Sequence, residues 1–254
     1  MEGTYYKEWS AALGREMEFK VYGHSGVPVL ALPARGGRFY DWENNGMPEA
    51  AARLLHEGKI QLFCADSIDT ESLLAGNVKP RRRAEMQEKY FLYLTTELAA
   101  RIRELNAPED KAAKKPAPIW CAGVDTGAYQ AVLCRLRRPE LFAGAIALSG
   151  LYNMGRFFGD AADDLILRSS PLAILPEEGI LNKKLLSAAD ENSLLFCVGQ
   201  GGYEGDALAD TQALADALKA AALPCHLEVW GSDVSHDWYW WGKEFGMFAE
   251  RLFG

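Results

Sequence analysis

A carboxylate occupies the position at which a sharp strand-to-helix turn normally presents a nucleophilic hydroxyl. The stretch Gly123-Val124-Asp125-Thr126-Gly127 has the G-x-S-x-G form of a nucleophile elbow, with Asp125 in place of the serine. In such an elbow the two glycines allow the strand and the helix to cross closely, and the residue at the tip is presented for chemistry. An apolar run precedes the motif and a helical pattern follows it, as the motif requires.

An elbow of this kind needs an acid and then a histidine later in the chain, and both occur in that order. Glu204 and Asp206 lie in the loop QGGYEGDALAD, directly after a predicted strand. His236 lies in GSDVSHDWYWW, directly after the last predicted strand. The sequence therefore predicts His236 as the base and leaves two candidates for the acid, of which Glu204 is slightly preferred.

Backbone N–H groups near the elbow are candidates for binding the oxyanion of a tetrahedral intermediate. One is the N–H of Thr126, directly after the elbow tip, and the others belong to Gly36 and Gly37 in the loop PARGGRF. A pocket for a small-molecule ligand is expected above the elbow. Its predicted lining is aromatic and consists of Phe39, Tyr152, Phe157, Phe158 and Trp238.

The elements that must position these residues follow an alternating pattern. Short apolar runs, most of them continuous, are separated by longer helical patterns, which predicts βαβ units and a doubly wound, mostly parallel sheet with helices on both faces. The predicted strands span residues 17–22, 28–33, 60–65, 119–123, 143–149, 194–199 and 226–230.

The helices and connections complete this α/β pattern. The segment 152–192 has no clear strand and is expected to run over the carboxyl edge of the sheet, where open α/β sheets bind ligands. The polar stretch 106–118 is predicted to be a connection inside one domain spanning residues 1–254, with little or no cap. The predicted helices span residues 48–57, 84–105, 128–137, 207–221 and 240–252.

Composition restricts the partners. The chain has 254 residues with 27 Lys and Arg against 35 Asp and Glu, so its net charge is −8, which argues against nucleic acid or an anionic membrane as a partner. No apolar run approaches the ~20 residues that span a bilayer, and the N-terminus MEGTYYKEWS has no signal-peptide core. The five cysteines are odd in number and include no C-x-x-C pair, which predicts reduced thiols, no zinc or other cofactor, and a cytoplasmic location. The oligomeric state is left open.

Several stretches resemble the α/β-hydrolase superfamily, particularly the esterase group that includes S-formylglutathione hydrolases and enterochelin and feruloyl esterases. The matching stretches are PARGGRFYDWENNGM, GVDTGAYQA, RRPELFAGAIALSGLYN, FFGD and SHDWYWW, and they cover most of the chain. The resemblance implies an α/β-hydrolase fold and an ester-like substrate. It places Asp125 at the position of that family's serine and His236 at that of its histidine.

An aspartate at this position is poorly suited to serine-type esterase chemistry. The tetrahedral adduct of a carboxylate with an ester can expel either the carboxylate, whose acid has a pKa of about 4, or an alkoxide, whose acid has a pKa of about 16. At about 1.36 kcal/mol per pKa unit the adduct favours reversal by roughly 16 kcal/mol, far more than the ~10²–10⁴-fold that general-acid catalysis contributes. We therefore expect weak or no serine-type ester hydrolysis.

Other roles for Asp125 stay open at this point. As a nucleophile toward saturated carbon it would resemble haloalkane dehalogenases and epoxide hydrolases, which also clamp the leaving group. Thr126 rather than tryptophan follows it, and nothing in the sequence pairs two of Tyr129, Tyr152 and Tyr203 for that purpose. Asp125 could also act as a base for water, cap the next helix and form an ion pair with His236, or belong to a non-catalytic binding protein. The sequence does not distinguish a catalytic aspartate from one that silences the site or was introduced by design.

Overall fold

The computed structural model describes residues 1–106, 118–161, 163–175 and 181–254. Within them, eight strands form one sheet in the order β1-β2-β4-β3-β5-β6-β7-β8. The pairs β1–β2 and β2–β4 are antiparallel, and all the others are parallel, so the prediction of a mostly parallel sheet is confirmed. The strands are β1 (Thr4–Ser10), β2 (Arg15–Tyr22), β3 (Val27–Leu32), β4 (Ile60–Ala65), β5 (Ile119–Val124), β6 (Phe142–Leu148), β7 (Leu194–Val198) and β8 (His226–Val229).

The first strand, β1, was not predicted. It pairs with β2 along its whole length, and its side chains alternate between an outward face with Tyr5, Lys7 and Trp9 and an inward face on which Tyr6 stacks against Phe19. Apolar runs reveal strands that are covered on both faces, whereas β1 is an edge strand with one face in solvent. Its mixture of aromatic and charged residues therefore gave no continuous apolar signal.

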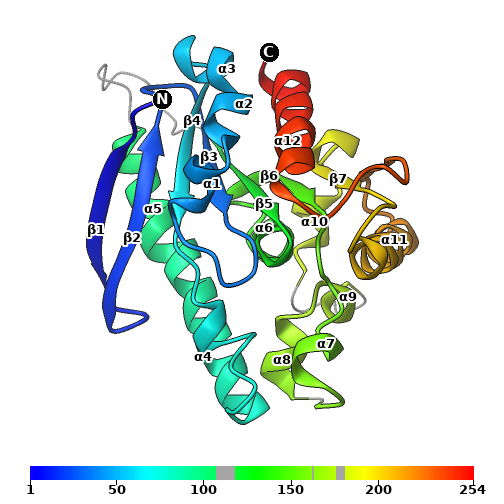
Figure 1. Cartoon of the computed structure of the whole chain (residues 1–254). Coiled ribbons are helices and arrows are strands. Elements are labelled where there is room, and N and C mark those ends of the chain that lie inside the picture. Colours follow the sequence, from blue (N-terminus) through cyan, green and yellow to red (C-terminus); the bar gives the residue numbers. More distant parts are fainter. Residues whose placement is uncertain (107–117, 162, 176–180) are drawn as a thin grey trace.

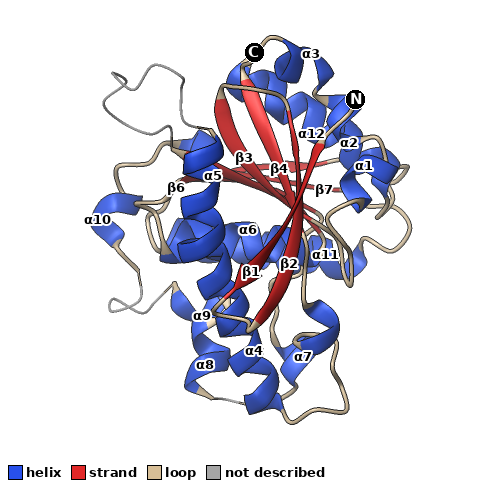
Figure 2. Cartoon of the chain, turned by 90° about the vertical axis from the view of Figure 1, so that its left-hand side faces the viewer, coloured by secondary structure: helices blue, strands red, loops and turns tan. Residues whose placement is uncertain are grey.

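Helices cover both faces of the sheet (Figure 2). One hydrophobic cluster joins one face to α4, α5, α6 and α11, and a second joins the other face to α1, α3 and α12. The longer helices are α4 (Pro80–Leu92), α5 (Ala99–Leu105), α6 (Thr126–Arg137), α11 (Gly205–Ala220) and α12 (Trp238–Phe253), and the shorter ones near the N-terminal half are α1 (Asp41–Asn44), α2 (Met47–Ala50) and α3 (Ala52–His56).

Two predicted helices are interrupted. The helix expected over 48–57 breaks at Ala51 into α2 and α3. The helix expected over 84–105 contains the π-helical turn η2 (Tyr93–Leu98) between α4 and α5, and the Thr95 hydroxyl donates to the carbonyl of Phe91 there. A periodic apolar face does not reveal such a wider turn, because it preserves the helical direction while changing the hydrogen-bond spacing.

The segment between β6 and β7 forms four short helices and no strand among its described residues, as expected. Three of them, α7, α8 and α9, lie below the sheet in Figure 1, near the lower end of α4. The predicted connection over 106–118 lies mostly outside the described residues. The four helices are α7 (Gly155–Phe158), α8 (Asp164–Arg168), α9 (Pro171–Ile174) and α10 (Lys183–Leu186). The short 3₁₀ turn η3 (Glu191–Ser193) follows them directly before β7, and a second 3₁₀ turn, η1 (Asp69–Glu71), follows β4.

Candidate active site

The elbow forms where β5 ends and α6 begins, in the middle of the sheet. Asp125 has φ 54° and ψ −119°, a conformation that a non-glycine residue adopts at a cost of about 1–3 kcal/mol. A Cβ on Gly123 would lie 2.1 Å from the carbonyl oxygen of Gly127, and one on Gly127 would lie 2.4 Å from that of Leu32. Only glycine fits at these two positions, so the predicted reason for the G-x-x-x-G spacing agrees with the packing.

The Asp125 side chain is buried and turns away from the helix that it precedes. It occupies the N-cap position of α6 but accepts no hydrogen bond from the first turn, so the helix-capping alternative is wrong. Its Oδ2 atom accepts from the backbone N–H of Arg35 at 3.4 Å, and its Oδ1 atom lies 3.4 Å from the Arg35 guanidinium. The carboxylate thus faces the loop after β3.

His236 lies between two carboxylates. Its Nδ1 atom is 3.2 Å from Oε2 of Glu204, and its Nε2 atom is 3.8 Å from Oδ2 of Asp125. Burial lowers the pKa of the imidazole, but the hydrogen bonds and negative charges of Asp125 and Glu204 outweigh burial and raise the pKa to about 9. The ring is therefore an imidazolium at neutral pH.

Glu204 is fully buried and firmly held. Its Oε1 atom accepts from the Ser149 hydroxyl at 2.6 Å and lies 3.4 Å from the N–H of Gly199. Trp241 donates its indole N–H to Ser149 at 3.0 Å, and its ring contacts His236 edge-on with ring centres 4.9 Å apart. A chain of hydrogen bonds therefore runs from Trp241 through Ser149 and Glu204 to His236.

The other candidate acid lies away from this chain. The Asp206 carboxylate is exposed and forms an ion pair at 2.8 Å with Arg156. Because Glu204, and not Asp206, contacts His236, the geometry favours Glu204 as the acid.

The loop after β3 uses its N–H groups differently from the sequence prediction. The N–H of Gly37 donates to the carbonyl of Ala34 at 2.8 Å and closes a turn. The N–H of Gly36 points to Asp69, and the N–H that faces the elbow is that of Arg35. On the elbow side the predicted donor is the backbone N–H of Thr126, and the hydroxyl of the same residue donates to Asp69 at 2.7 Å.

Two further buried carboxyl groups were not predicted. Burial raises the pKa of Asp69 to about 6 despite hydrogen bonds from Thr126 and Gly36. Burial likewise raises the pKa of Glu244 to about 7; it lies beside the Cys197 thiol, and neither oxygen has hydrogen-bond geometry with any described residue. Both groups lie close to the site, Asp69 on the elbow side and Glu244 on the side of the acid and histidine.

The five predicted pocket residues do not converge. Tyr152 has no exposed surface and packs against Phe196 in the core, and Phe158 is also buried there. Phe39 contacts the rings of two exposed tyrosines, Tyr5 at a tilt and Tyr40 edge-on. Phe157 packs at the edge of the core, and Trp238 lines a groove between α12 and the turn before α2.

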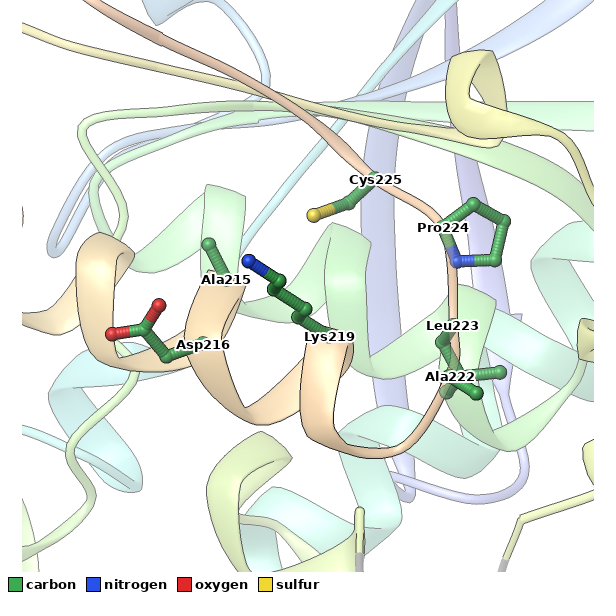
Figure 3. Close-up of a pocket in the computed structure, with 7 residues that line it drawn as sticks. All are labelled: Ala215, Asp216, Lys219, Ala222, Leu223, Pro224 and Cys225. Carbon is green, nitrogen blue, oxygen red and sulfur yellow. The ribbon is translucent and has the colours of Figure 1, made fainter.

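Two hollows lie elsewhere. The groove beside Trp238, of about 540 Å³, includes Tyr239, Gly242 and Lys243 in its lining. The other, of about 440 Å³, is formed by the last turn of α11 and the segment leading into β8, with Lys219 and Cys225 in its wall (Figure 3). Because it precedes β8, it lies at the amino end of a strand, on the edge of the sheet opposite to the elbow. Within the described ranges, no His, Cys, Asp and Glu side chains cluster in a way that could hold a metal.

Several site residues that were not predicted from the sequence share one positional feature. Asp69 and Ser149 each follow the carboxyl end of a parallel strand, and Arg35 follows another. Polar residues at this edge of an open α/β sheet are candidates by position alone. Glu244 and Trp241 gave no comparable signal, because they lie inside an amphipathic helix.

The strand order, the strained elbow and the acid–histidine pair after the last strands define an α/β-hydrolase. A family model described as "Putative esterase" matches residues 10–248, and the chain belongs to this esterase family. No curated protein sequence matches the chain significantly.

Solved structures share the fold at low sequence identity. A ferulic acid esterase aligns with a TM-score of 0.70 at 16% identity, and the alignment covers 97% of this chain and 95% of the esterase chain. An S-formylglutathione hydrolase from Agrobacterium tumefaciens aligns with a TM-score of 0.70 at 17% identity, covering 98% and 95%. One from Staphylococcus aureus aligns with a TM-score of 0.67 at 14% identity, covering 100% and 96%. The expected α/β-hydrolase fold and esterase resemblance are thereby confirmed.

Among the described residues, no helix has both the length and the apolar character needed to cross a membrane.

Proposed function

We propose that this chain is an esterase-family α/β-hydrolase in which Asp125 suppresses serine-type ester hydrolysis while the acid–histidine pair persists. The observation that carries this proposal is the position of the Asp125 carboxylate. It accepts from the Arg35 N–H and lies 3.8 Å from Nε2 of His236. One anion therefore contacts both an oxyanion donor and the base.

Two physical consequences support suppression. The imidazolium of His236, whose pKa is raised to about 9, has no lone pair at neutral pH with which to accept a proton from an attacking group. The Arg35 N–H already binds a negative charge, so a developing oxyanion would have to displace it. The reversal of a carboxylate–ester adduct adds to both effects.

The partner and the location belong to the same proposal. We expect the ligand to be a small, ester-like molecule, as the names of the similar esterases indicate. All five cysteines are free and four are buried, which supports a reducing, cytoplasmic environment.

The direct test compares p-nitrophenyl acetate and butyrate hydrolysis by the parent chain, Asp125→Ser and Asp125→Ser/His236→Ala. We expect an inert parent and a serine variant whose activity is at least about 10²-fold higher, within the range of general-base catalysis. The added His236→Ala change should abolish the gain. An active parent that loses its activity in Asp125→Ser would refute the proposal.

A second candidate is a hydrolase that uses Asp125 as nucleophile toward saturated carbon. The Arg35 N–H on Oδ2 of Asp125 favours it, because the same donor would stabilise the oxyanion when water attacks an alkyl-enzyme ester. A tyrosine clamp for the leaving group has no support: Tyr129 and Tyr152 have no exposed surface, and Tyr203 is 96% exposed.

This candidate predicts a trappable adduct. His236→Phe should accumulate an alkyl ester on Asp125 with a haloalkane or epoxide, seen as an added mass that maps to the elbow peptide. The His236→Phe/Asp125→Asn variant is the matched control. Unchanged mass across a panel of such substrates would eliminate the candidate.

A further inference from the structure

We propose that Asp69 is a positioning residue that joins the two sides of the oxyanion hole, the loop after β3 and the start of α6. The inference rests on the proposed function, in which the oxyanion hole persists around Asp125. It assigns a role to a carboxylate outside the elbow, the acid and the histidine.

One oxygen of Asp69 makes both contacts. Its Oδ2 atom accepts from the Thr126 hydroxyl at 2.7 Å and from the backbone N–H of Gly36 at 3.4 Å. Thr126 directly follows the elbow tip, and Gly36 directly follows Arg35, whose N–H faces Asp125. Asp69 itself lies on η1, after β4, so its side chain connects three separate segments: η1, the loop after β3 and the start of α6.

The contacts explain which N–H faces the elbow. Gly36 has φ +66°, a left-handed conformation that turns the chain after Arg35. With the Gly36 N–H bound to Asp69, the Arg35 N–H is the loop donor left pointing at the elbow tip. Without the Asp69 anchor, the loop would lose its only side-chain hydrogen bond at Gly36 among the described residues.

An acidic residue at this place is costly, and its surroundings offset the cost only in part. Asp69 is almost completely buried, and burial raises its pKa to about 6. The positive end of α6 and the Arg35 guanidinium attract its charge, whereas Asp125 repels it. Both hydrogen-bonding partners are donors that meet the same oxygen, and an ionised carboxylate oxygen accepts such bonds more strongly than the neutral oxygen of an amide.

The first arm of the test uses Asp125→Ser as the parent and p-nitrophenyl butyrate as the substrate. Thr126→Val removes the hydroxyl but keeps the shape, and Thr126→Ser keeps the hydroxyl. We expect Thr126→Val and Asp69→Ala each to lower kcat about 10–100-fold with KM within about two-fold, since small misplacements of donors reduce turnover. Thr126→Ser should stay within about three-fold, and Asp69→Ala/Thr126→Val should fall no further than the worse single variant.

The second arm needs no activity and uses the unaltered Asp125 chain. Amide hydrogen exchange of Arg35 and Gly36 is followed by NMR in the same set of variants. We expect Thr126→Val and Asp69→Ala to accelerate exchange at both amides by about ten-fold or more, and Thr126→Ser to leave it unchanged. If Asp69→Ala does not fold, the Thr126 pair still decides the outcome.

The two arms separate the two proposals. An inert Asp125→Ser variant together with faster Arg35 exchange in Thr126→Val overturns the proposed function and supports the joining role of Asp69. Unchanged exchange at both amides overturns the role of Asp69, whatever the activity. Equal loss of activity in Thr126→Ser and Thr126→Val also overturns it, because the hydroxyl would then be irrelevant.

Discussion

The two halves of the site differ in how tightly they are held. On the side of the acid and histidine, Glu204 accepts at 2.6 Å from Ser149 and lies 3.2 Å from His236. On the elbow side, Asp125 has contacts of 3.4 Å with Arg35 and a 3.8 Å ion pair with His236. Hydrogen bonds near 2.7–2.9 Å are strong, whereas those near 3.4 Å are weak.

This difference supports the proposal that Asp125, at the elbow, suppresses ester hydrolysis. In the half that orients the histidine, Glu204 contacts His236 and is itself bound by the buried Ser149 hydroxyl, as the proposed acid–histidine pair requires. The half that should deliver a nucleophile holds a carboxylate by long, mainly electrostatic contacts. A single substitution at the elbow is therefore expected to restore more chemistry than any substitution on the other side.

The largest expected effect tests the acid. In the Asp125→Ser background, Glu204→Gln should lower kcat by about 10²–10⁴-fold, because the imidazolium formed during catalysis would lose its anionic partner. Asp206→Asn is the matched control and should change kcat by less than about two-fold, since Asp206 pairs with Arg156 at the surface. Equal losses in the two variants would contradict the assignment of Glu204.

The next effect is the pH dependence of stability. His236 has a folded pKa of about 9, above its ordinary value, so its stabilising contribution is complete below about pH 6.5 and is lost as the pH rises through 9. We expect the parent to lose about 3 kcal/mol of unfolding free energy over this range through this group, measured by urea denaturation.

Variants isolate that contribution. His236→Gln should remove the loss of unfolding free energy between about pH 6.5 and 9, and Asp125→Asn should make it smaller. His24→Gln changes an exposed histidine and should leave the loss in place. An NMR titration of the His236 ring with a midpoint near 6.5 would show that the two carboxylates do not hold its proton.

A smaller effect is expected behind the acid. Ser149→Ala removes the 2.6 Å donor to Glu204 and the acceptor for Trp241, and should destabilise the fold by about 1–3 kcal/mol in thermal or urea denaturation. Ser25→Ala, at an exposed hydroxyl, should change stability by less than about 0.5 kcal/mol. If Ser149→Ala matched this control, the acid side would be no more tightly held than the elbow side.

The smallest effect concerns Glu244, the buried acid beside the tightly held half. Its pKa is raised to about 7, so its contribution is favourable at low pH and is lost as the pH rises from about 4.5 through 7. Glu244→Gln should reduce the loss of unfolding free energy between pH 5 and 8 by about 1 kcal/mol or more. A parent and variant with parallel pH profiles would mean that Glu244 is ionised throughout this range.

The sequence predicted the fold more fully than the site. Seven of the eight strands were predicted close to their observed positions, because continuous apolar runs mark strands that are buried on both faces. The elbow with Asp125 could be predicted from a local pattern, because two glycines four residues apart, Gly123 and Gly127, must flank its tip. The contact of His236 with Glu204 could be predicted because an acid follows one late strand and a histidine follows the last strand, in the chain order that an elbow of this kind needs.

The other features of the site depend on contacts between residues that are far apart in the chain, and the sequence alone does not show these contacts. Whether Gly36 or Arg35 turns its N–H toward the elbow depends on Asp69, more than thirty residues away in the chain. The aromatic residues Tyr152 and Phe158 were predicted to line a pocket, and they belong to the segment that was expected to run over the carboxyl edge of the sheet. Their burial in the core results from the path of the short helices after β6, for which the sequence showed no periodic pattern.

The edge strand β1 has a consequence for how copies of this protein meet. An exposed edge offers unpaired backbone groups to a second sheet, and aromatic residues such as Tyr5 and Trp9 would favour such pairing. In an antiparallel, two-fold pairing that overlaps the whole of β1, its middle residue Lys7 would lie opposite the same lysine of the other copy. Like charges at the centre of the shared sheet would repel, so this strand discourages two copies from joining their sheets through β1.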